Sequence, residues 1–144
     1  MNDDRRLAKT IMIQGTGSSV GKSVIVAALC RILKQEGYCV APFKAQNMSL
    51  NSFVTRENGE ISRAQAVQAE AAGVEPSVHM NPVLLKPSAD NKAQVVLLGK
   101  HQVLLTAAEY QNCKKRFWKY IVASLHQLQQ KYQVVVLEGA GSPA

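Results

Sequence analysis

Hydrophobic residues along this chain come in short blocks that polar, glycine-rich or proline-rich stretches separate. Residues 10–13 and 38–43 are apolar blocks of strand length, and between them apolar residues recur at helical spacing. These helical positions are Ile25, Ala28, Leu29 and Ile32. Because Gly37 supplies a helix stop, the pattern predicts a strand, a helix and a second strand in this part of the chain.

The middle of the chain is predicted to be mostly loop around one helix. Residues 45–59 form a polar segment rich in Asn and Ser, whereas residues 61–72 have the Ala, Gln and Glu content of a helix. Gly73 follows directly and is expected to close that helix. Prolines then recur and predict irregular structure over the next stretch: Pro76, Pro82 and Pro87.

The last part of the chain is predicted to add two strands and a long helix. Residues 93–98 are rich in valine and leucine, and residues 133–137 form a final apolar strand. Between them Thr106 is expected to cap a helix that runs to about Lys131. Its apolar face comprises Cys113, Phe117, Tyr120, Ile121, Leu125 and Leu128. This alternation predicts right-handed βαβ units in an α/β fold, with a mostly parallel sheet and helices on both of its faces.

The glycine-rich segment between the first strand and the first helix has the composition of a phosphate-binding loop. Its residues are Gly15, Thr16, Gly17, Ser18, Ser19, Val20, Gly21, Lys22 and Ser23. Glycines let successive backbone N–H groups turn inward around a polyphosphate, and the helix N-terminus adds further N–H donors. Lys22 can reach β- and γ-phosphate oxygens, and the Ser23 hydroxyl can ligate Mg²⁺. The segment therefore predicts a P-loop NTPase-like fold that binds ATP and Mg²⁺.

This loop is one residue longer than the commonest form, G-x-x-x-x-G-K-[ST]. That pattern would place its first glycine at Thr16, whereas the matching glycine in this chain is Gly15, one residue earlier. The alternative interpretation is an ordinary strand-to-helix turn rich in small residues. The apolar strand before the loop and the helical pattern after it favour the phosphate-binding interpretation.

An acidic residue ends the last predicted strand. Glu138 lies at the carboxyl end of this strand, which is the edge where ligands of open α/β sheets bind. We therefore expect Glu138 to share Mg²⁺ with Ser23, the alternative being a solvent-exposed carboxylate at a strand end. The sequence stops soon afterwards, so the domain is expected to be C-terminally truncated, with the strand that carries Glu138 left uncovered.

Charge and cysteine content narrow the range of partners. The 144 residues carry a formal net charge of +7, yet the basic residues are spread along the chain. Nucleotide phosphates or an acidic substrate therefore fit better than nucleic acid. No apolar run approaches the roughly 20 residues of a membrane span, so we expect no membrane partner and a cytoplasmic location. The thiols lack disulfide or zinc spacing and are expected to be buried and reduced: Cys30, Cys39 and Cys113.

Five segments carry a resemblance that covers nearly the whole chain. They are G-T-G-S-S-V-G-K-S (15–23), P-F-K-A-Q-N-M-S-L-N-S (42–52), G-E-I-S-R-A-Q-A-V-Q-A (59–69), M-N-P-V-L-L-K-P (80–87) and L-E-G-A-G-S-P-A (137–144). In these segments the chain resembles the cobyric acid synthases, which are glutamine-dependent amidotransferases of cobalamin biosynthesis. The resemblance is to their synthetase part, which is similar to dethiobiotin synthetase. The F-K-x-Q-N-M-x-x-N-S segment is far more specific than the loop, and the longer loop is the form that this family uses.

The resemblance implies ATP-dependent amidation of a carboxylate. The γ-phosphoryl group would pass to a side-chain carboxylate of adenosylcobyrinic acid a,c-diamide, and glutamine-derived ammonia would displace phosphate from the acyl phosphate to give cobyric acid. Lys44 would neutralise charge between the γ-phosphate and the attacking carboxylate, the alternative being an ordinary surface lysine. The residues expected to contact the corrinoid are Gln46, Asn47, Asn51, Arg63 and Lys86. For Asn51 and Lys86 a purely structural role stays open.

The resemblance also implies a domain organisation. Residues 1–144 would form one ATP-binding synthetase domain, and the glutaminase domain that supplies ammonia would lie outside this sequence and act as its partner.

Another class, the switch ATPases of chromosome partitioning and division-site placement, has an extra lysine near the start of the loop. This chain has Gly15, Thr16 and Gly17 at that place, which disfavours a switch ATPase. The nearest alternative enzyme is cobyrinic acid a,c-diamide synthase, which the 43–52 segment disfavours, and a third alternative is an inert fragment.

Overall fold

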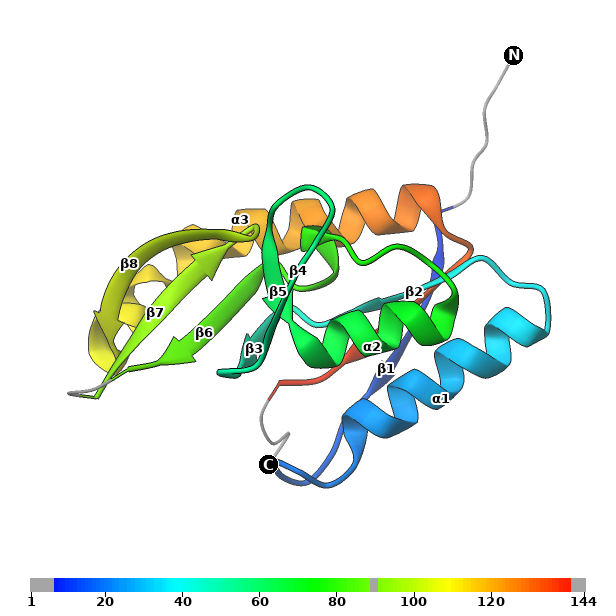
Figure 1. Cartoon of the computed structure of the whole chain (residues 1–144), viewed down its shortest axis with the longest axis horizontal. Helices are drawn as coiled ribbons and strands as arrows, with labels where there is room; N and C mark the ends of the chain where they lie inside the picture. The colour runs from blue at the N-terminus through cyan, green and yellow to red at the C-terminus, as the bar shows by residue number, and fades with distance from the viewer. Residues whose placement is uncertain (1–6, 89–90, 141–144) are drawn as a thin grey trace, which may run out of the picture.

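The computed structural model describes residues 7–88 and 91–140, and a three-stranded parallel sheet lies at the centre of the fold (Figure 1). The strands are β1 (Lys9–Ile13), β2 (Val40–Phe43) and β9 (Val134–Glu138), in the order β1-β9-β2. All of their pairings are parallel. The predicted α/β fold with a parallel sheet is therefore confirmed.

The last strand lies in the middle of this sheet, which corrects the expectation that it is left uncovered. β9 pairs with β1 along one side and with β2 along the other, and Val134, Val135 and Val136 are buried. Within the described ranges β1 is an edge strand instead, and its Ile11 and Met12 are 41% and 54% exposed. The reason is topological, because parallel crossovers can insert the last strand of a chain between two earlier ones.

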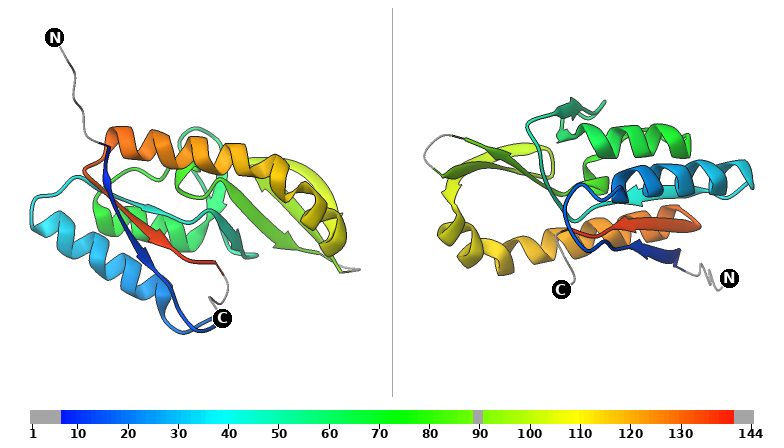
Figure 2. Two further views of the ribbon diagram at one scale, coloured as in Figure 1. Left: turned by 180° about the vertical axis from the view of Figure 1, so that it is seen from behind. Right: turned by 90° about the horizontal axis from the view of Figure 1, so that it is seen from below.

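Helices lie on both faces of this sheet (Figure 2). Successive side chains of a strand point to opposite faces. Accordingly, Val134 and Val136 pack against α1 (Lys22–Gln35), whereas Val135 packs against α3 (Ala107–Lys131). The predicted coverage of both faces is therefore confirmed.

The packed face of α1 differs from the predicted stripe. Val26 and Cys30 are fully buried against the sheet, whereas Ile25 and Ile32 are 49% and 52% exposed. Since Val26 and Cys30 lie one helical turn apart, the helix packs through a face that is rotated from the predicted one. Leu29 is the residue of the predicted stripe that packs against this cluster. The apolar spacing could not decide between these faces, because α1 has apolar residues on both.

Local signals mark both ends of α2 (Arg63–Ala72), which packs against α1 and β2. Ser62 caps the helix, because its hydroxyl accepts a backbone N–H of the first turn at 3.2 Å. The helix therefore begins two residues later than predicted, and Ile61 lies in the preceding strand. Gly73 ends the helix at a φ of 68°, as the pattern predicted.

A second, mixed sheet lies partly in the region that was predicted to be mostly loop (Figure 1). Its strands are β3 (Gln46–Met48), β6 (Val83–Pro87), β7 (Lys92–Leu97) and β8 (Lys100–Thr106), in that order across the sheet. β3 is parallel to β6, and the other two pairs are antiparallel. A separate hairpin pairs β4 (Ser52–Val54) with β5 (Glu60–Ser62).

Among these strands the sequence predicted one, over residues 93–98, and β7 confirms it. The predicted loop over residues 45–59 is wrong where β3 and β4 form. The irregular structure predicted around the prolines is wrong at β6 and at the short 3₁₀ helix η1 (Val78–Met80). β3 and β4 have three residues each, which is too short for a periodic pattern. β6 begins after Pro82 and ends at Pro87, and strand ends tolerate proline.

α3 lies across both sheets (Figures 1 and 2). The Thr106 hydroxyl accepts the Glu109 N–H at 3.3 Å, and the Glu109 carboxylate accepts the Thr106 N–H at 2.7 Å, which together make a capping box. Phe117 packs on the mixed sheet and Leu128 on the parallel sheet, so the predicted cap is confirmed, and the predicted apolar face is confirmed except at Tyr120, which belongs to neither core. No helix in the described ranges, α3 included, is both long and apolar enough to cross a membrane.

The three thiols differ in exposure, which corrects the expectation that all of them are buried. Cys30 is buried in α1, and Cys113 is half-buried in α3. Cys39 is exposed. Its strand begins one residue later, at Val40, so Cys39 lies in the connection rather than in the sheet.

Candidate functional site

The loop between β1 and α1 has the backbone geometry that its small residues permit. Ser19 and Gly21 have positive φ angles of 58° and 96°, and Gly21 lies directly before α1. A Cβ at Gly15 would lie 2.7 Å from a methyl carbon of Val20, so a side chain there would collide with the loop. Lys22 is buried, and its Nζ donates a hydrogen bond to a loop carbonyl oxygen at 2.5 Å. The lysine ammonium is therefore held over the loop.

The N-terminus of α1 adjoins the same loop. Gly21 has no side chain with which to cap the helix, and the first turn contains no acidic residue. The first N–H groups of a helix have no intrahelical partner, and the helix dipole adds partial positive charge at this end. The loop and the helix start together therefore suit an anion such as a phosphate group.

A buried carboxylate joins the loop to the second strand. Glu138 is 4% exposed, and its Oε1 accepts hydrogen bonds from Ser23 Oγ at 2.8 Å and from Lys44 Nζ at 2.6 Å. Because β1, β9 and β2 are parallel neighbours, their carboxyl ends bring the loop, Glu138 and Lys44 to one edge of the sheet. The Lys44 ammonium compensates the negative charge of this buried carboxylate.

A cavity of about 720 Å³ lies beside this carboxylate. Its lining residues are Ser18, Ser19, Gly21, Lys22, Ser23, Val24, Lys44, Gln46, Asn47, Met48, Glu138, Gly139 and Ala140. The structure thus brings much of the predicted loop, the predicted catalytic lysine and both predicted metal ligands to one cavity. Four further loop residues do not line it: Gly15, Thr16, Gly17 and Val20.

Two of the predicted corrinoid contacts, Gln46 and Asn47, also line this cavity. Gln46 Oε1 accepts a hydrogen bond from the Tyr110 hydroxyl at 2.6 Å. Asn47 Nδ2 donates to Ser62 Oγ at 2.7 Å and to Gln65 Oε1 at 2.8 Å. These amides therefore link β3 to the capped start of α2 and to α3, and their contact with a substrate stays a prediction.

The other predicted corrinoid contacts do not line this cavity: Asn51, Arg63 and Lys86. Asn51 is exposed, and the Arg63 guanidinium lies 5.8 Å from the centroid of the Phe53 ring. Lys86 forms an ion pair with Glu60 at 2.5 Å. The structure gives each of these residues a local setting outside the cavity, and their role toward a substrate stays a prediction.

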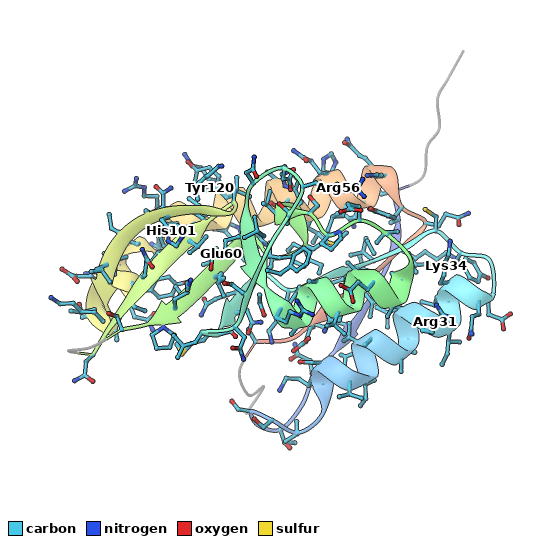
Figure 3. All side chains as sticks on the ribbon, viewed as in Figure 1. Arg31, Lys34, Arg56, Glu60, His101 and Tyr120 are labelled. Atoms are coloured by element: carbon cyan, nitrogen blue, oxygen red, sulfur yellow. The ribbon has the colours of Figure 1, made fainter. Side chains whose placement is uncertain are left out.

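Glu60 forms a charged cluster with Lys86 and His101, and Figure 3 shows Glu60 and His101 close together. His101 Nε2 lies 2.8 Å from Glu60 Oε2. Burial raises the pKa of Glu60, but hydrogen bonds from Lys86 and Ser52 and the positive charges of Lys86 and His101 outweigh it and hold that pKa below its ordinary value. The cluster ties β5, β6 and β8 together.

Two buried glutamines of α2 belong to the site and were missed by sequence reasoning. Gln68 Nε2 donates to Glu138 Oε2 at 2.7 Å and to Ser23 O at 3.3 Å, and Gln65 accepts the hydrogen bond from Asn47. Within the described residues, Gln65 Nε2 and Gln68 Oε1 have no hydrogen-bond partner. The available signal was their spacing, because two glutamines one helical turn apart share a face with buried alanines, where apolar residues are usual.

The donor set at Glu138 suits a metal ion bound together with phosphate. In the described part of the chain no group of three or more His, Cys, Asp or Glu side chains converges on one point. The Ser23 hydroxyl and the Glu138 carboxylate, 2.8 Å apart, are hard oxygen ligands. Mg²⁺ is commonly held by one or two such protein groups, with substrate phosphates and waters completing its shell. The residues present therefore fit Mg²⁺ rather than an ion held by protein ligands alone.

The fold and the site together define a class of protein. A phosphate-binding loop after a parallel strand, a lysine and a serine at the helix start, and a carboxylate at the end of the neighbouring strand are the parts of a P-loop nucleotide-binding domain. The sequence model of the CobQ/CobB/MinD/ParA nucleotide binding domain matches residues 11–140, and the chain belongs to this family.

Curated proteins named cobyric acid synthase are similar to this chain. The protein from Dehalococcoides mccartyi (strain CBDB1) is 58% identical over 138 residues, and the one from Thermoanaerobacter sp. (strain X514) is 61% identical over 138 residues. Both alignments cover 96% of this chain and 27% of the relative, so the chain spans about a quarter of the length of these relatives. The predicted resemblance is confirmed, although residues 141–144 of the last resembling segment lie outside the described residues.

Proposed function

We propose that this chain is the ATP-binding synthetase part of a cobyric acid synthase. In the proposed reaction ATP converts side-chain carboxylates of adenosylcobyrinic acid a,c-diamide into acyl phosphates, and glutamine-derived ammonia converts these into amides. The observation that carries the proposal is the convergence of Ser23, Lys44 and Glu138 beside the loop. Its other support is identity of 58% and 61% to curated cobyric acid synthases.

The loop would hold the phosphates. Its backbone N–H groups and the N-terminus of α1 would bind phosphate oxygens, and Lys22 would turn its ammonium from the loop carbonyl to the β- and γ-phosphates. Ser23 and Glu138 would hold Mg²⁺, which neutralises phosphate charge when it is bound. In this role Glu138 would keep its carboxylate toward the loop through the hydrogen bond from Gln68.

Lys44 would act on the acceptor side of the transferred phosphoryl group. Its ammonium follows the carboxyl end of β2 and lines the same cavity as the loop. It can therefore reduce the repulsion between the γ-phosphate and an approaching carboxylate. Phosphoryl transfer depends mainly on positioning and charge neutralisation, so a fixed cation at this point is the contribution that the protein can make.

We propose further that residues 1–144 act as one synthetase domain in the cytoplasm and depend on a glutaminase partner for ammonia. Glutamine hydrolysis by such partners needs an activated thiolate. Burial raises the pKa of the Cys30 thiol to about 12, so this thiol stays protonated at neutral pH. The half-buried Cys113 lies on the packed side of α3.

A domain exchange tests the proposed function. The aligned segment of the Thermoanaerobacter protein would be replaced by this chain, since the two are 61% identical over 138 residues. With ATP, Mg²⁺ and glutamine, the chimera should convert adenosylcobyrinic acid a,c-diamide to cobyric acid, which mass spectrometry would detect. The same chimera with Lys22→Ala should make no product, because the cation for the phosphates is lost. A folded chimera that binds ATP but leaves the corrinoid unamidated would contradict the proposal.

A further inference from the structure

A second cavity lies between the mixed sheet and the start of α3. It encloses about 630 Å³, and three strands contribute apolar side chains to it: Leu85 of β6, Val95 of β7 and Leu105 of β8. Tyr110 of α3 also lines it, with its ring centroid 5.7 Å from that of Phe117. The described elements thus form a largely apolar pocket next to β3.

The two cavities adjoin along β3. Gln46 and Met48 line both of them. The Tyr110 hydroxyl, which belongs to the second cavity, holds Gln46 Oε1 at 2.6 Å. Met48 is 62% exposed and unbranched, so its side chain can adapt to a ligand. A molecule in the second cavity would therefore lie next to the cavity that contains Lys44.

The chemistry of the second cavity differs from that of the first. The first combines the loop with the ammonium groups of Lys22 and Lys44, which suits phosphate. In the second, apolar residues are accompanied by the polar side chains of Asn91, Lys92 and Gln111. An apolar lining with a few polar groups is typical of sites for organic ligands. The Lys92 ammonium and the two amides suit carboxylate and amide groups on such a ligand.

We infer that the second cavity binds the body of the acceptor, while one acceptor carboxylate reaches Lys44 past Gln46 and Met48. This inference rests on the proposed function, which supplies the class of acceptor, a large ring system that bears carboxylate and amide arms. It places Gln46 at the boundary between acceptor and nucleotide. It also assigns acceptor contacts to Lys92 and Tyr110, which sequence reasoning had not selected.

Equilibrium binding to the 144-residue chain tests this placement. Ala93→Phe adds a ring to the lining of the second cavity, and it should weaken binding of adenosylcobyrinic acid a,c-diamide by about tenfold or more. Lys92→Gln removes one exposed charge, and it should weaken this binding about two- to fivefold, the range of a single exposed ion pair. Neither substitution should change the affinity for ATP, because neither residue lines the first cavity.

Lys9→Gln is the matched control. Lys9 is an exposed lysine on β1 of the other sheet, so its substitution should change neither affinity. If the unmodified chain binds both ligands and neither cavity substitution weakens acceptor binding, the placement is wrong and the proposed function stands. If the chain binds ATP but not the acceptor, the placement is wrong, and amidation by the chimera decides the proposed function separately. Should Ala93→Phe unfold the chain and abolish ATP binding, the exposed Lys92→Gln variant decides the question.

Discussion

Glu138 is the residue on which the site is built. Its two carboxylate oxygens accept hydrogen bonds from three different elements, through Ser23 of α1, Lys44 after β2 and Gln68 of α2. An ionised carboxylate that is 4% exposed is costly to bury, and these partners offset that cost. The partners are a hydroxyl, an ammonium and an amide, so single substitutions can test the proposed metal binding, charge neutralisation and positioning one at a time.

Glu138→Gln keeps the shape of the side chain and removes its charge. A neutral amide is a poorer ligand for a hard cation, so the Mg²⁺ concentration for half-maximal ATP turnover by the chimera should rise about tenfold or more. Binding of metal-free ATP should change much less. A titration of Mg²⁺ against turnover measures the effect, and an unaltered Mg²⁺ requirement would leave Glu138 with a structural role alone.

Lys44→Met keeps an unbranched side chain and removes the ammonium. The kcat of the chimera should fall by about 10²-fold, the scale of losing one preorganised electrostatic contact, while the KM for ATP stays nearly constant. The substitution also leaves Glu138 buried without its counter-charge, so the chain should be less stable. Lys44→Met combined with Glu138→Gln should recover thermal stability but not kcat. A change in ATP affinity alone would show that Lys44 does not act on the transferred group.

Gln68→Leu removes the donor that holds Glu138 Oε2 at 2.7 Å. Loss of a group that orients a metal ligand typically costs about 10- to 100-fold in metal affinity, so the Mg²⁺ requirement of the chimera should rise by that factor. Gln127→Leu, at an exposed position of α3, is the control for the change in side-chain type. Lower thermal stability with an unchanged Mg²⁺ requirement would mean that Gln68 only packs.

At the scale of elements, helix boundaries followed local signals and short strands did not. The capping box at Thr106 and the glycine at Gly73 lie where the sequence predicted them. The strands β3, β4 and β5 have three residues each, too few for an alternating pattern to show; β3 pairs with β6, which lies further along the chain, and β4 and β5 pair with each other in a hairpin. The Glu60 cluster with Lys86 and His101 adds a charged link among strands of this region.

This cluster predicts a pH dependence of stability. The pKa of Glu60 in the folded chain lies below its ordinary value of 4.5, so its contribution to stability is present above that pH and is lost as pH falls through the folded pKa. Glu60→Gln should therefore be less stable than the natural chain at about pH 7 and nearly equal to it at low pH. Denaturant unfolding at both pH values measures this, with Glu70→Gln at an exposed position of α2 as the control. An equal deficit at both pH values would contradict a charge effect.

At the scale of the whole molecule, α3 joins the two sheets into one unit. Leu128 packs in the core of the parallel sheet and Phe117 in that of the mixed sheet, so the nucleotide cavity and the second cavity are held side by side. This arrangement places the phosphate-binding loop next to the cavity that we infer to bind the acceptor.

The purified chain should release no glutamate from glutamine, with or without ATP and corrinoid. Cys30 is buried with its pKa raised to about 12, which keeps the thiol protonated. In the described part of the chain, His79 and His101 contact Ser124 and Glu60 rather than a thiol. An enzymatic glutamate assay measures the outcome. Glutamate release that a Cys39→Ser substitution abolishes would reveal a nucleophile at the exposed thiol and contradict this prediction.

The sequence by itself determined the parts whose signals act over a few residues. The loop conformation depends on Gly15 and Gly21, and the helix ends depend on Thr106 and Gly73, so these features follow from neighbouring residues alone. The apolar run at residues 133–137 also identified Glu138 as the residue at the carboxyl end of a strand.

Only the tertiary structure decided which side chains meet at the site. β9 lies between β1 and β2, and this long-range pairing places Glu138 where Ser23 and Lys44 can both reach it. Gln68 joins them because α2 packs against α1 and β2, and the second cavity exists because short strands pair under α3. The order of the strands and the burial of the Gln68 side chain depend on residues far apart in the chain, so no local sequence pattern predicts them.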